Sequence, residues 1–271
     1  MRTINSRQFL KILKGEDLEF RISQYPVRLV DKVKLEGLHF PYDIHFRDSV
    51  FQELSFRNCR FSGDLSFSGS KIGKLSLRAC DFRHLSVKQT EVLQFEVKKS
   101  VQAKSVTIGA SAINSLVIEH NEVFESIELG CENHIMQASL SYNGDIQKNS
   151  FKSTIFICPE RFDILKLKNN CAEILHVGTI GEHAQFEVEN LSANLLLFSN
   201  CNGESTNVAL RGLRPIDPAV ASVCIVNSER IVRLNDQGVF NAFSRIKRYK
   251  HSPSDLQETK QGLLGLEGRQ C

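Results

Sequence analysis

The chain has 271 residues, of which 24% are charged, and it carries a formal net charge of +3. So small a net charge does not by itself indicate a polyanionic partner, and a chain with no Trp and four Tyr offers little aromatic surface on which nucleic acid bases could stack. No apolar run approaches the roughly 18 residues of a membrane-spanning helix. None of the eight cysteines forms a CxxC motif, which argues against a zinc or redox site.

Residues 1–32 are expected to form an N-terminal cap. Ser6 is the predicted N-cap of a short amphipathic helix that presents Phe9, Ile12 and Leu13 on one face and ends at Gly15. Charges run through this stretch, so it does not read as a signal peptide, and reduced cysteines and a cytoplasmic location are expected. The lead-in over 16–31 then connects this cap to the repeats that follow.

From Val33 to about Leu140 the chain repeats a five-residue unit: an apolar or small residue, any residue, an apolar residue and two further residues. Leu54/Phe56 and Cys59/Phe61 are two such units. Residues two apart point to the same face of an extended strand, and the remaining three residues are enough for a corner. Helical repeats space their apolar residues differently, so the period predicts a β-solenoid.

Four units make a coil of 20 or 21 residues, and equivalent residues recur at that spacing. The expected columns inside the coil are Leu54, Leu75, Phe95 and Leu116; Phe56, Leu77, Val97 and Ile118; Phe67, Val87, Ile108 and Leu129; and Phe40, Phe61 and Phe82. Stacking at about 4.8 Å would fill the interior with these columns. Cys59 and Cys80 lie one coil apart and are expected to be small core residues.

Three units resemble the pentapeptide-repeat family, whose pattern is a small residue, any residue, Leu or Phe, and two free positions: Cys59-Arg60-Phe61, Cys80-Asp81-Phe82 and Thr90-Glu91-Val92. The resemblance covers residues 33–140 and, more loosely, 155–210. It implies an all-β fold, a right-handed parallel β-helix with short N- and C-terminal capping helices. Alternate units place Leu at the small position (Leu54, Leu65, Leu75, Leu85), so a wider or flatter coil than the family's square one is expected. Some members act as DNA mimics, a role that needs a strongly acidic surface, which this chain lacks.

The repeats are expected to continue to residue 234, giving seven or eight coils, with an excursion loop at 141–154. The region 235–271 is expected to hold a C-terminal helix over 236–251, with Phe240, Phe243 and Ile246 on one side, and a flexible tail from Ser254. The helix reads as a second cap, and displacement of a cap would permit homo-oligomers or end-to-end assembly.

Charge is unevenly distributed along the repeats. Arg57, Arg78 and Lys98 directly follow stacked core residues, so they should project outward as a basic ladder. The segment 105–142 contains no Lys or Arg and holds the further candidate binding residues Glu119, Glu122 and Glu128. These two patches are the predicted binding surfaces.

The pattern favours a non-catalytic scaffold that binds a protein through its outer face or ends. One alternative is a carbohydrate-active or other β-helix enzyme, although Asp163, Glu187 and Glu189 are not spaced as an acid–base pair. The other alternative is the soluble part of a membrane-linked pentapeptide-repeat protein. No catalytic residue, metal ligand or cofactor is predicted, and the partner is expected to be protein rather than nucleic acid.

Overall fold

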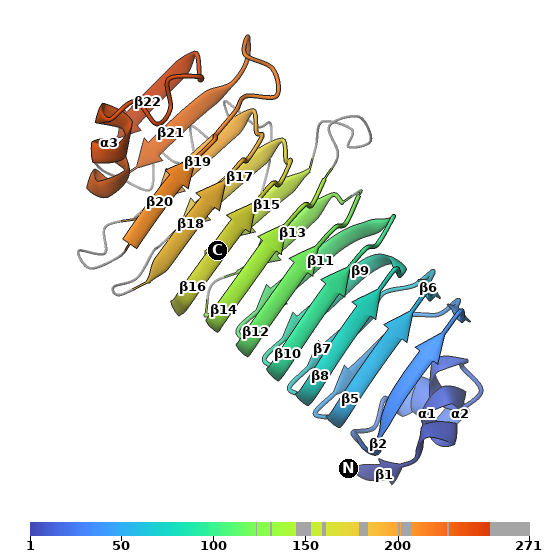
Figure 1. Cartoon of the computed structure of the whole chain (residues 1–271). Helices are drawn as coiled ribbons and strands as arrows, with labels where there is room; N and C mark the ends of the chain where they lie inside the picture. Colours follow the sequence, from blue (N-terminus) through green and yellow to red (C-terminus); the bar gives the residue numbers. More distant parts are fainter. Residues whose placement is uncertain are drawn as a thin grey trace.

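The computed structural model describes residues 1–249 except 123, 131, 145–152, 159–160, 179–183, 200, 202–206 and 227. The described chain forms an elongated parallel β-solenoid, in which strands stack side by side from the N-terminal to the C-terminal end (Figure 1). Each coil contributes to two sheets, here called sheet A and sheet B. Sheet A has ten strands and sheet B has twelve, so the solenoid has about ten coils rather than the seven or eight expected.

Sheet A is formed by β1 (Arg2–Ile4), β2 (Val27–Glu36), β5 (Val50–Arg57), β8 (Lys71–Arg78), β10 (Glu91–Lys98), β12 (Ala112–Glu119), β14 (His134–Ser141), β16 (Arg161–Lys168), β18 (Gln185–Glu189) and β20 (Asn207–Arg211). Sheet B is formed by β3 (His39–Phe40), β4 (Ile44–Arg47), β6 (Arg60–Phe61), β7 (Leu65–Ser68), β9 (Asp81–Lys88), β11 (Ala103–Gly109), β13 (Ser126–Leu129), β15 (Thr154–Ile157), β17 (Ile174–Gly178), β19 (Leu195–Ser199), β21 (Ser222–Val226) and β22 (Arg245–Tyr249). The repeats thus begin at β2, earlier than residue 33.

The core consists of the predicted columns. Leu54, Leu75 and Phe95 are partners in adjacent strands of sheet A, and Phe67 and Val87 are partners in sheet B. All five side chains are buried, and each contributes roughly 1.5–3 kcal/mol by leaving water. Strands of the two sheets alternate along most of the chain, so successive coils add to both sheets.

Each strand of sheet A from β2 to β20 is followed by a residue in the left-handed conformation. These corner residues are Gly37, Asn58, Ala79, Lys99, His120, Tyr142, Asn169, Asn190 and Gly212. The left-handed conformation costs a non-glycine residue about 1–2 kcal/mol, and an inter-coil hydrogen bond offsets it; the Asn58 N–H, for example, donates to the Arg78 carbonyl at 3.0 Å. The next residue is buried in several coils, as Cys59, Cys80 and Asn143 are.

Two helices, α1 (Ser6–Leu13) and α2 (Leu18–Ser23), cover the N-terminal end (Figure 1). The predicted face of α1 is buried, and Phe9 stacks on Phe46 of the first coils with ring centroids 5.6 Å apart. The N-cap is Asn5, not Ser6. The Asn5 side chain accepts from the Gln8 N–H at 2.9 Å and the Gln8 side chain accepts from the Asn5 N–H at 3.0 Å, which is a reciprocal capping box.

The C-terminal end differs from the expected helix over 236–251. The helix there, α3 (Glu229–Asp236), ends where the predicted helix begins, and Arg245–Tyr249 forms β22, which pairs with β21. Phe240 and Phe243 are both buried, but they belong to a turn and the residue after it rather than to a helix. Their spacing of three residues is also that of one helix face, which is why the sequence suggested a helix. Pairing with β21 satisfies the backbone of 245–249, which outweighs the local helical pattern. The expected tail from Ser254, and the excursion over 145–152, lie outside the described residues.

Candidate functional site

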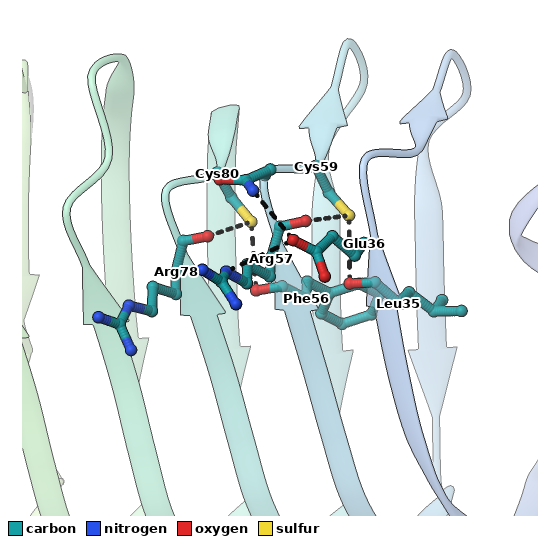
Figure 2. A network of polar contacts seen from close by, with 8 residues as sticks. Leu35, Glu36, Phe56, Arg57, Cys59, Arg78 and Cys80 are labelled. Atoms are coloured by element: carbon teal, nitrogen blue, oxygen red, sulfur yellow. Dashed lines mark hydrogen bonds and ion pairs between the residues drawn. The ribbon is translucent and has the colours of Figure 1, made fainter.

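The outer face of sheet A brings the three predicted basic residues into one column. Arg57, Arg78 and Lys98 are partners in β5, β8 and β10, and Figure 2 shows Arg57 and Arg78 on successive coils. The column is bounded by Glu36 on β2 and Glu119 on β12. We call Arg57, Arg78 and Lys98 the basic column.

The acids at its two ends pair with the outer cations. Arg57 Nε lies 3.5 Å from Glu36 Oε1, and Lys98 Nζ lies 3.1 Å from Glu119 Oε1. Arg78 is exposed and forms no ion pair with any residue that the structure describes. Two unit charges one strand spacing apart repel by roughly 1 kcal/mol even in water. The middle of the basic column therefore carries positive charge that its neighbours do not offset.

Elsewhere on sheet A, cations and acids alternate between coils. The pairs are Lys32–Glu53 at 3.9 Å, Lys71–Glu91 at 3.0 Å, Lys74–Glu96 at 3.7 Å, Lys166–Glu187 at 3.3 Å and Lys168–Glu189 at 3.0 Å. A hydrogen bond from Gln185 lowers the pKa of Glu187 below its usual value, and the positive charge of Lys166 lowers it further. Asp163 pairs with Arg161 at 3.6 Å. The three carboxylates considered for acid–base chemistry are thus each held by a cation.

The three predicted acidic residues do not form one patch. Glu119 ends the basic column, Glu122 lies past the corner, and Glu128 is on the outer face of β13 in sheet B, in register with Thr107. Their closeness in sequence did not reveal that the chain crosses from one sheet to the other between them.

A groove runs along the corner beyond sheet A, and the sequence did not indicate it. Its volume is about 890 Å³, and its lining residues are Lys99, His120, Glu122, Tyr142, Gly144, Asn169, Asn170, Cys171, Asn190 and Ser192. The left-handed corner residues of five successive coils are among them. In the sequence, these corner residues are marked only by recurring one coil apart. That recurrence can be recognised only after the structure has shown which residues form the corners.

Planar side chains stack along this groove. The rings of His120 and Tyr142 are 4.7 Å apart and parallel within 3°. On the following coils, Asn190 Nδ2 donates to Asn169 Oδ1 at 3.1 Å. Tyr142 is 48% exposed, so about half of this residue is open to a ligand.

The groove offers binding groups rather than a catalytic pair. Glu122 is the one carboxylate among its described lining residues, whereas glycoside hydrolysis ordinarily uses two. Over the described part of the chain, no three His, Cys, Asp or Glu side chains are grouped as metal ligands would be. His84 hydrogen-bonds Ser105 of the next coil at 2.6 Å.

The chain matches no protein-family model, no curated protein and no solved structure. None of the described helices is both long and apolar enough to cross a membrane.

Proposed function

We propose that the protein is a non-catalytic scaffold that binds an acidic segment of another protein on the outer face of sheet A. The observation that carries this proposal is the position of Arg78. Its in-register neighbours Arg57 and Lys98 are both cations, and each of those has its own acid at 3.5 Å or less. A carboxylate of a partner would complete the charge alternation found on the rest of this face.

A protein partner fits this surface better than a nucleic acid does. The basic column is short and ends in Glu36 and Glu119, which would repel a phosphate backbone that continued along the rod.

We also propose that the chain is a divergent pentapeptide-repeat protein and that it is cytoplasmic. The buried small residues after the corners, such as Cys59 and Cys80, support the first point. The free thiols of the six cysteines that the structure describes support the second.

The test is capture of partners from the native host by wild-type protein and by the Arg57→Ser/Arg78→Ser/Lys98→Ser variant. A matched control, Lys32→Ser/Lys166→Ser/Lys168→Ser, removes the same charge from the same face at positions that are already paired. A protein lost only with the basic column, and released by salt, is the expected result. Equal capture by all three proteins would refute binding at this column.

The groove supports a second candidate function, binding of a linear saccharide. Its stacked rings, amides and hydroxyls suit a hydroxyl-rich chain, and its length over five coils is about 19 Å at the strand spacing. Calorimetric titration with cellohexaose and chitohexaose, using Tyr142→Ala as the control, tests it. Binding that Tyr142→Ala weakens supports the candidate; binding of neither sugar, or binding that this variant leaves unchanged, removes it.

A further inference from the structure

Cys59 and Cys80 lie on successive coils at the same corner. They directly follow the left-handed residues Asn58 and Ala79, and Figure 2 shows the two sulfur atoms side by side. Backbone contacts fix the alignment, because the Asp81 N–H donates to the Cys59 carbonyl at 3.0 Å. The solenoid thus joins two cysteines that no sequence motif connects.

The spacing suits a covalent bond between the coils. Adjacent strands are about 4.8 Å apart, and the Cα atoms of disulfide-bonded cysteines are usually 4.4–6.8 Å apart. The Cβ atoms must close to about 3.8 Å, however, which is less than the strand spacing. A disulfide here would draw two corners together, and the resulting strain would make it easy to reduce.

The two thiols are not equivalent. Cys59 Sγ contacts the carbonyls of Arg57 at 3.3 Å and Leu35 at 3.6 Å, and Cys80 Sγ contacts those of Phe56 at 3.4 Å and Arg78 at 3.5 Å. The hydrogen bond from Cys80 lowers the pKa of Cys59, whereas the same contact and burial raise the pKa of Cys80. Cys59 is also the less buried of the two, so it is the thiol expected to react first, and thiolate is the reactive form.

We propose that Cys59 and Cys80 are a reversible oxidation site at which a small hydroperoxide forms a disulfide between two coils. The Cys59 thiolate attacks hydrogen peroxide; an S–O bond forms, the O–O bond breaks, and hydroxide leaves. The Cys80 sulfur then attacks the sulfenic acid of Cys59; the S–S bond forms, the S–O bond breaks, and water leaves. The sum is two thiols and one hydrogen peroxide giving one disulfide and two waters.

The burial of Cys59 and Cys80 limits the size of the oxidant that can reach them. Cys59 is 2% exposed and Cys80 is fully buried, so only a molecule about the size of water can reach them through a brief opening of the corner. The column continues in Ser100, the buried residue that occupies the equivalent position of the next coil. Serine therefore fits this corner, and Cys→Ser variants are suitable probes.

The experiment treats the folded full chain with hydrogen peroxide, removes the peroxide, unfolds the protein in urea with iodoacetamide to block the remaining thiols, and digests it with trypsin. Cleavage after Arg57, Arg60, Arg78 and Arg83 gives the peptides 58–60 and 79–83, whose disulfide-linked mass is diagnostic. We expect this linked pair to be the main oxidation product and to disappear with dithiothreitol. Cys224, whose pKa burial raises to about 11, is the internal control and should stay reduced.

Variants test the order of events. In Cys80→Ser that has been treated with peroxide while folded, dimedone present during unfolding in urea should label Cys59, because the sulfenic acid has no second thiol to react with; unfolding is needed because the folded corner excludes a reagent of this size. In Cys59→Ser, Cys80 should stay unlabelled. Circular dichroism confirms that both variants fold. Labelling of Cys80 in Cys59→Ser, or absence of the linked peptide when wild-type protein has consumed peroxide, would overturn the proposal.

Discussion

Buried asparagines continue the cysteine column in the middle coils. Asn121 Nδ2 donates to Asn143 Oδ1 at 2.8 Å, and Asn143 Nδ2 donates both to Asn170 Oδ1 at 3.1 Å and to the Ile118 carbonyl at 2.8 Å. A buried polar group is costly unless it is hydrogen-bonded. These amides meet that requirement by bonding to the amide of the next coil and to a backbone carbonyl. The column aligns successive coils at a position where apolar packing alone would permit slippage.

Asn143→Ala should destabilise the protein by about 1–3 kcal/mol, because it leaves the amides of Asn121 and Asn170 and the Ile118 carbonyl short of a buried partner. Urea unfolding followed by circular dichroism measures this loss. Asn114→Ala, on the exposed outer face of β12, is the control and should change stability little. Equal effects of the two substitutions would show that the buried column does not stabilise the coils.

At the scale of the strand, the face on which a residue lies decides whether it tolerates a charge, and two leucines on opposite faces should behave differently. Leu75 on β8 is fully buried, whereas Leu93 on β10 is 59% exposed on the outer face. Leu75→Asp would place a charge in the apolar interior and should abolish cooperative folding. Leu93→Asp is the matched control and should unfold at nearly the same urea concentration as wild type; thermal and urea melts of both variants check the assignment of faces.

How far the sequence predicts these elements depends on what determines each of them. The columns through Leu54 and Phe67 were predictable because a strand has a period of two and the coil has a nearly constant length. The helix expected over 236–251 was wrong because pairing with β21, a contact outside the segment, decides its structure. The one-coil spacing of Cys59 and Cys80 also predicted that they would stack and be buried, as they are. The groove at His120 and Tyr142 depends on the corner conformation, which no residue type marks: Asn, Ala, Lys, His and Tyr all adopt it.

Across the whole molecule, a solenoid gains stability from contacts between neighbouring coils, so its two ends are special. The helices α1 and α2 cover the N-terminal end (Figure 1). In the described part of the chain, β22 is the last strand of sheet B, and it presents Arg245 and Lys247 outward from its exposed surface. Charged residues on an edge strand prevent pairing with another chain, because repulsion and desolvation oppose the approach of a second edge.

Arg245→Thr/Lys247→Thr should therefore promote end-to-end association. Threonine keeps the strand propensity of β22 while removing both charges, so the edge can pair with a second copy. Sedimentation velocity at rising protein concentration should show dimers and longer species for this variant. Lys32→Thr/Lys166→Thr removes the same charge from β2 and β16, which have strands on both sides, and should stay at the wild-type state. If both variants associate equally, lower net charge rather than the edge drives assembly, and the basic residues of β22 have no protective role.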